Sequence, residues 1–130
     1  APGKARGTNM VPTLVCDGEG TPLTAVGAPG GAVIVSAVFQ AIVNLLDFNM
    51  SPIEAVSCPR IHCEGGRVFL EAGIRTDYTQ KLEQYGHTTN KEPLALHPMM
   101  ARVQIARKNN DAIQGGSDPR AGGGSVTVAY

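Results

Sequence analysis

The stretch Gly27-Ala28-Pro29-Gly30-Gly31 is followed directly by Ala-Val-Ile-Val-Ser-Ala-Val-Phe-Gln-Ala-Ile-Val-Asn-Leu-Leu, residues 32–46. Gly27 permits a tight or left-handed backbone and Pro29 fixes one φ angle, so this part of the chain is predicted to be a rigid turn. The following residues are apolar except for one polar residue in every four, a spacing that forms a single stripe on a helix: Ser36, Gln40 and Asn44. We therefore expect a turn that opens onto a helix belonging to the core.

Two successive glycines stand where this helix is predicted to begin. Neither Gly30 nor Gly31 has a side chain to shield its amide, and the first N–H groups of a helix lack intrahelical partners and lie at the positive end of its dipole. Such a pair can hold an anionic oxygen and form an oxyanion hole for acyl transfer. Because most short Gly/Pro clusters are only turns, the pattern alone leaves both interpretations open.

Length and composition predict one globular domain, residues 1–130, and exclude two classes of partner. Lysine plus arginine equals aspartate plus glutamate at 11 each, and aromatic residues make up only 5%, which argues against nucleic-acid binding. The apolar run at 32–46 is shorter than the roughly 18 residues of a membrane span and carries three polar interruptions, so no membrane span is predicted. Sixteen glycines and nine prolines favour a mixed fold with many turns over a helical bundle.

The rest of the chain is predicted to alternate between short strands, turns and helices. Strands are expected over residues 13–16, 21–26, 60–63, 67–71, 87–90, 100–107, 112–115 and 125–130. The first two are expected to form one hairpin and the next two a second. With no repeat at a fixed period, this order predicts a layered α+β fold.

Local signals mark two further helices and one tight turn. Ser51-Pro52-Ile53-Glu54 has the residues of a capping box, with serine at the N-cap, proline at N1 and glutamate at N3. Thr76 is expected to cap a helix over Asp77–Tyr85, with Gly86 as its stop. Near the end of the chain, Ser117-Asp118-Pro119-Arg120 is predicted to be a turn that the Asp118 and Arg120 side chains hold in place.

The histidines and cysteines give no sign of a metal site. The histidines are scattered, without the spacing of metal ligands, so neither a metal nor another cofactor is predicted: His62, His87 and His97. The three cysteines fit no zinc motif and are expected to be buried thiols: Cys16, Cys58 and Cys63. A Cys58–Cys63 bridge is the alternative in an oxidising compartment.

The residues also offer no nucleophile. A Gly-x-Ser-x-Gly elbow is absent, no cysteine stands at a helix N-terminus, and Ala1 has neither a hydroxyl nor a thiol. The sequence therefore contains half of a catalytic site, an anion-binding turn without its attacking group.

Four motifs in order resemble the C-terminal half of the gamma-glutamyltransferase small subunit. They are Thr8-Asn9-Met10-Val11-Pro12-Thr13, Gly27-Ala28-Pro29-Gly30-Gly31, the run from Met50 to Val56 with Pro59-Arg60-Ile61-His62, and Ser117-Asp118-Pro119-Arg120. The resemblance implies an N-terminal-nucleophile hydrolase with a four-layer α/β/β/α sandwich, whose precursor cleaves itself and exposes a threonine. That threonine takes a γ-glutamyl group, as in glutathione, and passes it to water or an amine, without a cofactor. The threonine is expected upstream of Ala1, so this segment alone is expected to be inactive.

The same resemblance implies roles for four residues and a set of partners. The amides of Gly30 and Gly31 are expected to form the oxyanion hole, and Thr8 and Asn9 to bind the α-carboxylate of the glutamyl group once the preceding loop folds back toward the turn. The partners implied are the large subunit and the N-terminal part of the small subunit, together with a small γ-glutamyl substrate. An extracytoplasmic location is also implied.

Some positions depart from the family pattern and leave alternatives open. Asn9 replaces a hydroxyl residue, Ala28 stands where serine is usual, and Cys63 follows His62 where a second histidine is common. One alternative is an acylase or amidase of the same fold that acts on a glutaryl or polyglutamate group. The other is a non-catalytic lobe that only binds.

Overall fold

A five-stranded sheet forms the base of the computed structural model, which describes residues 2–122, 124, 128 and 129. Its strands are antiparallel and follow the order β1-β2-β6-β7-β8: β1 Thr13–Cys16, β2 Pro22–Gly27, β6 Gln104–Asn109, β7 Ala112–Ser117 and β8 Val128–Ala129. The predicted hairpin of the first two strands is confirmed, with Thr13 opposite Val26. Of the predicted last strand, residues 125–127 and 130 lie outside the described residues.

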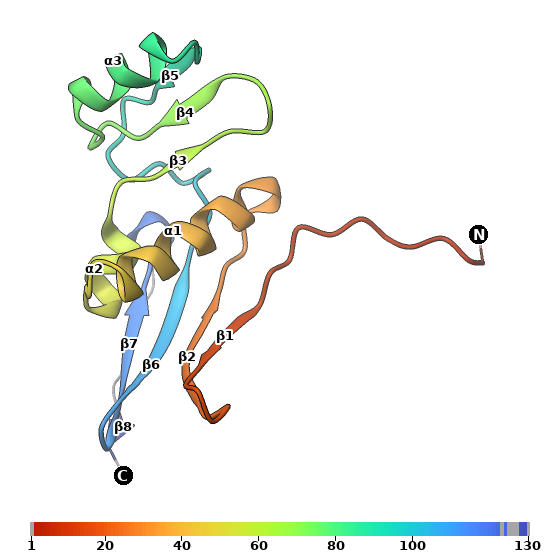
Figure 1. Cartoon of the computed structure of the whole chain (residues 1–130), viewed down its shortest axis with the longest axis vertical. Helices are drawn as coiled ribbons and strands as arrows, with labels where there is room; N and C mark the ends of the chain where they lie inside the picture. Colours follow the sequence, from red (N-terminus) through yellow and green to blue (C-terminus); the bar gives the residue numbers. More distant parts are fainter. Residues whose placement is uncertain (1, 123, 125–127, 130) are drawn as a thin grey trace.

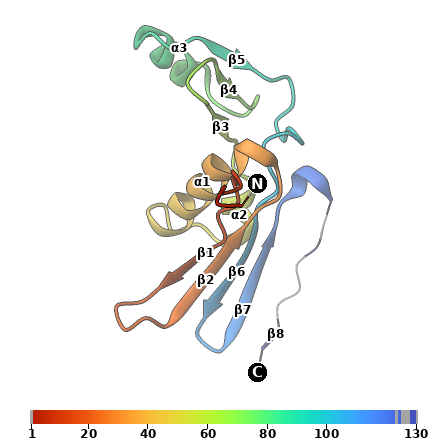
Figure 2. The same cartoon turned by 90° about the vertical axis from the view of Figure 1, so that its right-hand side faces the viewer.

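Two helices cover one face of this sheet, as Figures 1 and 2 show. The short 3₁₀ turn η1 (Gly31–Val33) leads into α1 (Ile34–Leu46), and α2 (Pro52–Ser57) follows. The core lies between helices and sheet, where apolar side chains from both layers are buried: Val26, Ile34, Ala37, Val38, Ala41, Leu45, Ala55, Val56, Ala101, Val103 and Ile105. The predicted capping box starts α2, because the Ser51 side chain and the Ser51 backbone N–H both pair with Glu54. The mixed α+β class is thus confirmed.

The expectation that the long helix belongs wholly in the core is wrong for its outer side. Val35, Phe39 and Leu46 are exposed, Phe39 by 65%, because α1 lies on the sheet with only one face turned toward it. The polar stripe faces neighbouring elements, since Gln40 Nε2 donates to Ile61 O (2.8 Å) and Asn44 Nδ2 donates to Ala55 O (3.3 Å). Polar residues on this helix therefore fasten it to its neighbours.

A second, three-stranded sheet stands at one end of the molecule, with α3 (Thr76–Gln84) on its outer side (Figure 1). Its order is β3 (Ile61–His62), β4 (Val68–Leu70) and β5 (Thr89–Lys91). The predicted second hairpin is confirmed as the antiparallel pair β3–β4, and β5 joins β4 in parallel.

The helix α3 begins at a different cap from the one predicted. Its N-cap is Arg75, whose backbone is extended, and Thr76 is already helical. The Arg75 guanidinium pairs with the Asp77 carboxylate in the first turn, with Nε 2.9 Å from Oδ1. An acidic residue at this position is favoured by the positive end of the helix dipole. Gly86, with a φ of 90°, follows the helix end as expected.

The strand predicted over residues 100–107 begins only at Gln104. Ala101 has a φ of 60°, which is incompatible with an extended strand, and the N–H of Arg102 donates to Pro29 O at 3.1 Å. This segment therefore pairs with the turn before α1 instead of with a strand.

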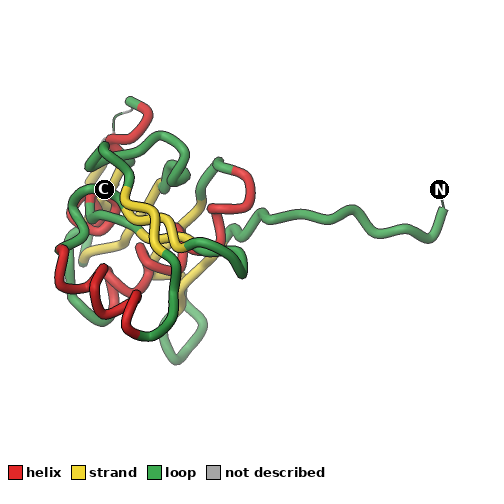
Figure 3. The backbone as a smooth tube through the Cα atoms, turned by 90° about the horizontal axis from the view of Figure 1, so that it is seen from above, coloured by secondary structure: helices red, strands yellow, loops and turns green. Residues whose placement is uncertain are grey.

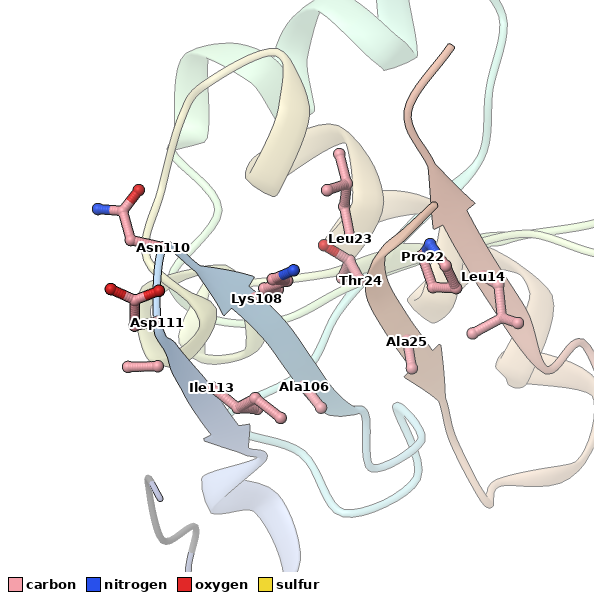
Figure 4. A pocket seen from close by; sticks show the side chains of 11 residues that line it. Leu14, Pro22, Leu23, Thr24, Ala25, Ala106, Lys108, Asn110, Asp111 and Ile113 are labelled. Carbon is pink, nitrogen blue, oxygen red and sulfur yellow. The ribbon is translucent and has the colours of Figure 1, made fainter. Parts of the chain in front are cut away.

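The other face of the five-stranded sheet has no helix layer among the described residues. Figure 4 shows Leu14, Ala25, Ala106 and Ile113 projecting from β1, β2, β6 and β7, where they line a hollow of about 440 Å³. The chain thus supplies one helix layer and one sheet layer of the expected sandwich. The N-terminal end of the described chain extends away from the body as an arm (Figures 1 and 3).

Candidate functional site

The turn between β2 and α1 leaves its two glycine amides accessible. Gly30 has φ 153° and Gly31 has φ 69°, conformations that residues with a Cβ rarely adopt. Both glycines are exposed, and among contacts between described residues neither N–H donates a hydrogen bond. The helical run from Gly31 to Leu46 follows directly, so the amides stand at its positive end. This arrangement fits the predicted anion-binding turn.

Gly30 lies directly against the segment before β6. A Cβ placed on Gly30 would be 2.5 Å from Ala101 Cβ and 2.6 Å from Ala101 Cα, distances that real Cβ atoms do not show. A Cβ on Gly31 would meet open space. The two glycines are therefore required for different reasons, Gly30 for close approach as well as conformation and Gly31 for conformation alone.

The arm before β1 passes the start of α1. The antiparallel pairing of Thr13 with Val26 places the chain before β1 and the glycine turn after β2 at the same end of the hairpin. Asn9 lines a cavity of about 290 Å³ together with Ala32 of η1. Thr8 is exposed, and its Oγ1 accepts from the Met10 N–H at 3.1 Å. Asn9 is thus near the helix start.

A histidine of β3 stands beside the same cavity. His62 Nδ1 lies 2.8 Å from Ser36 Oγ, and Ser36 Oγ also donates to Val33 O at 3.1 Å. Through these two contacts the Ser36 hydroxyl joins the start of α1 to the His62 ring of β3. His62 also borders a second, more apolar cavity of about 300 Å³ with Val33, Phe69 and Met100. Sequence reasoning did not assign His62 to the site.

A buried cluster of four charged side chains lies behind the turn. Its members are 5% exposed or less: Arg60, Glu71, Asp118 and Arg120. Two arginines and two carboxylates make the cluster neutral, and Arg120 bridges both acids, with Nε 2.7 Å from Glu71 Oε1 and Nη1 3.0 Å from Asp118 Oδ1. The predicted Asp118–Arg120 tie is confirmed, but sequence reasoning missed Arg60 and Glu71 as its partners.

The charge of each group in this cluster depends on its neighbours. Burial alone raises the pKa of Asp118, but N–H groups of Arg120 and Val103 and the charge of Arg60 outweigh it and lower that pKa. Burial and the nearby Arg120 charge lower the pKa of Arg60. Burial opposes protonation of Arg120 as well, yet the hydrogen bonds and charge of Glu71 raise its pKa. Asp118 is therefore held as a carboxylate.

The cluster is connected to the glycine turn through one segment of backbone. Arg60 Nη1 donates to Met100 O at 3.0 Å and to Ala101 O at 3.3 Å. Asp118 Oδ2 accepts from the Val103 N–H at 2.9 Å. Since Ala101 packs on Gly30, the buried charges support the surface on which the turn rests.

The cysteines differ from the expected buried thiols. All three are unpaired, Cys16 and Cys63 are exposed, and Cys58 is half-buried beside the Met50 sulfur at 3.5 Å. Cys16 lies on the exposed edge strand β1, and Cys63 lies just beyond β3, so neither reaches the core. In the part of the chain that the structure describes, no three metal-ligating side chains form a group that could hold an ion. No helix of these residues is long and apolar enough to cross a membrane.

Comparisons with known proteins place this geometry in a family. The gamma-glutamyltranspeptidase family model matches residues 1–128. The acylase ACY 1 proenzyme of Pseudomonas sp. (strain V22) is 37% identical over 129 residues, covering 99% of this chain and 22% of that protein. The glutathione hydrolase proenzyme of Escherichia coli (strain K12) is 31% identical over 123 residues, 92% of this chain and 20% of that protein.

Solved structures agree with the sequence relatives. The gamma-glutamyltranspeptidase from Pseudomonas nitroreducens complexed with L-DON has a TM-score of 0.82 and 27% identity, over 98% of this chain and 66% of that one. The transpeptidase CapD of Bacillus anthracis, at 21% identity and a TM-score of 0.78, shares the fold over 96% of this chain. The chain spans about a fifth of the length of the curated relatives that it matches. With the family model matching nearly all of it, the chain belongs to the gamma-glutamyltranspeptidase family.

Proposed function

We propose that the complete protein transfers or hydrolyses γ-glutamyl groups by means of an N-terminal threonine that lies outside this chain. The observation that carries the proposal is the pair of unengaged, exposed amides of Gly30 and Gly31 at the start of α1. The glutathione hydrolase relatives support the same reaction class. This segment alone lacks the nucleophile and is expected to be inactive.

The proposed reaction uses these amides twice. The threonine hydroxyl oxygen attacks the γ-carbonyl carbon, and the carbonyl oxygen gains the negative charge that the Gly30 and Gly31 N–H groups stabilise. The intermediate collapses when the C–N bond breaks and the leaving amine takes the proton that the threonine hydroxyl gave up on attack. Water or an acceptor amine then attacks the acyl-enzyme through the same kind of intermediate and restores the threonine.

We assign binding of the glutamyl α-carboxylate to Thr8 and Asn9. The Thr8 oxygen accepts a backbone N–H, which leaves its hydroxyl proton available for a carboxylate. Asn9 lines the cavity at the helix start and can donate from its amide. The remainder of the precursor, both the large subunit and the first part of the small subunit, is proposed to complete this site.

A second candidate is an acylase for glutaryl or polyglutamate groups. It is favoured by the Pseudomonas acylase relative, which at 37% is more similar in sequence than the Escherichia coli glutathione hydrolase at 31%. Asn9 and Ala28, which depart from the transferase pattern, are compatible with a different acyl group.

We also propose an extracytoplasmic location, which both candidate functions share. Cell fractionation of the native host, followed by detection of the protein with an antibody, tests this location.

The test uses the complete protein and two anilide substrates. We expect self-cleavage into two subunits on a denaturing gel, and release of aniline from γ-glutamyl-anilide in preference to glutaryl-anilide. Replacing residue 31 by glycolic acid turns its N–H into an ester oxygen, and is expected to lower kcat by about 10²–10³-fold. The same replacement at exposed Gly18 in the β1–β2 turn is the matched control and is expected to change nothing.

The outcomes separate the candidates. Release from the glutaryl compound alone would support the acylase and exclude the transferase. If a correctly cleaved protein released aniline from neither compound, the result would support the hypothesis of a non-catalytic binding lobe. If the variant with glycolic acid at position 31 had an unchanged kcat, the Gly31 N–H would not be an oxyanion donor.

A further inference from the structure

We infer that Ala101 is a positioning residue for the oxyanion donors, because its left-handed backbone sets the place of the Pro29–Gly31 turn. This inference rests on the proposed function and goes beyond it, since Ala101 has no expected contact with substrate. Ala101 is completely buried, and the site that a Cβ on Gly30 would occupy lies 2.6 Å from its Cα. The turn therefore rests directly on the Ala101 backbone.

The Ala101 backbone is fixed from both sides. Toward the turn, the N–H of the next residue, Arg102, donates to Pro29 O at 3.1 Å. Away from the turn, Arg60 Nη1 donates to Met100 O and to Ala101 O. Arg60 itself is held by Asp118, with Nη2 2.7 Å from Oδ2. A movement of Ala101 would thus have to break bonds in the buried cluster or to the turn.

The conformation of Ala101 is unfavourable for its residue type. Among the described residues, the other non-glycine positions with positive φ are Asn49 and Asn110, and asparagine tolerates this region. Both asparagines are exposed, whereas Ala101 is buried against Gly30. Backbone strain persists only where the surroundings over-determine it, and it concentrates at functional sites. The strain at Ala101 coincides with a close contact to Gly30, one of the two proposed donors.

The variant Ala101→Gly separates positioning from folding. Glycine adopts positive φ without strain, which offsets the loss of one buried methyl group, so the unfolding temperature is expected to stay close to that of the parent protein. The turn loses the Cβ that it packs against and gains freedom. Because a misplacement of 1 Å costs on the order of 10²-fold in rate, we expect kcat to fall about 10-fold or more with KM unchanged.

The experiment compares three variants of the complete protein after self-cleavage. Asn110→Gly is the matched control, since it makes the same backbone change in the exposed β6–β7 turn. Ala101→Ser retains the Cβ and is expected to keep most of kcat. Crystal structures supply a readout that does not depend on activity, and the Gly30–Gly31 turn of Ala101→Gly is expected to shift by about 0.5 Å or more.

The possible results decide the inference. A lower kcat in Ala101→Gly alone, with a displaced turn and unchanged KM and unfolding temperature, supports it. An unmoved turn, an equal loss in Asn110→Gly, or a failure of Ala101→Gly to fold while Ala101→Ser folds would overturn it. If the parent protein releases no aniline, the proposed function fails, and the position of the turn in the crystals still decides whether Ala101 holds it.

Discussion

Arg60 and Asp118 form a buried ion pair in which Nη2 lies 2.7 Å from Oδ2 and both side chains are at most 3% exposed. Arg60 comes from the segment after α2, and Asp118 from the turn after β7, so the pair joins the helix layer to the sheet. The carboxylate is paired a second time by Arg120. Removing one member of such a group leaves the opposite charge buried without compensation.

Replacing Asp118 by alanine is therefore expected to destabilise the protein by about 3–5 kcal/mol, the usual cost of breaking a buried ion pair. Urea unfolding followed by circular dichroism measures the change. Asp77→Ala is the control, because Asp77 also pairs with an arginine but on the surface, where such pairs contribute little. Equal losses in the two variants would contradict the assigned role of burial.

Acid is expected to weaken the fold through the same carboxylate. The pKa of Asp118 is lower in the folded protein than the value of about 3.9 for an unperturbed aspartate. The stabilisation is then complete above the unfolded-state pKa and is lost as pH falls through the lowered, folded-state pKa. Urea midpoints measured from pH 7 downward are expected to drop below about pH 4, and Asp118→Asn is expected to flatten this drop. An identical slope in the variant would assign the acid effect to other groups.

The two glycines of the turn are expected to respond differently to alanine. In Gly31→Ala the new Cβ has open space, so the free energy of unfolding is expected to fall mainly by the cost of a left-handed alanine, about 1–2 kcal/mol. Gly30→Ala adds a clash with the Ala101 backbone, for which overpacking costs about 1–3 kcal/mol more. Thermal unfolding of the complete protein measures both, with Gly18→Ala as a control in open space. A Gly30 variant as stable as the Gly31 variant would refute the close packing.

Ser51→Ala is expected to cost roughly 1 kcal/mol, because it removes the oxygen that caps α2. Ser51→Thr keeps a capping oxygen and is expected to lose less. Hydrogen exchange of the α2 amides supplies the local measurement, since fraying should begin at the N-terminus of α2. Unchanged exchange in Ser51→Ala would show that packing of α2 on the sheet alone sets its start.

Local signals in the sequence predicted much of the fold. The strand over Thr13–Cys16 has the predicted bounds because apolar and β-branched residues occupy it between turn residues. The α2 cap follows from Ser51 and Glu54, which contact each other within one turn of chain. The glycine turn was also predictable, since its conformation depends on Gly30 and Gly31 themselves.

The parts that sequence reasoning missed depend on distant partners. Arg60 and Glu71 look like ordinary surface charges until β4 and the turn after β7 bring Glu71 and Arg120 together. Ala101 carries no turn signal, and its partners Gly30 and Arg60 are distant in the sequence. Phe39 is exposed because it lies on the side of α1 that faces away from the sheet. The apolar residues of the helix alone do not show which side faces the sheet.

The contact between Gln40 and Ile61 has a consequence for how copies of this protein meet. Gln40 Nε2 donates to Ile61 O, and Gln40 Oε1 accepts from the Ile61 N–H at 3.0 Å, so one side-chain amide takes both backbone groups on the outer side of β3. β3 is an edge strand, and free edges recruit strands from other molecules. At this position the Gln40 side chain of α1 occupies the place of the next strand, which protects the β3 edge of the small sheet against edge-to-edge pairing.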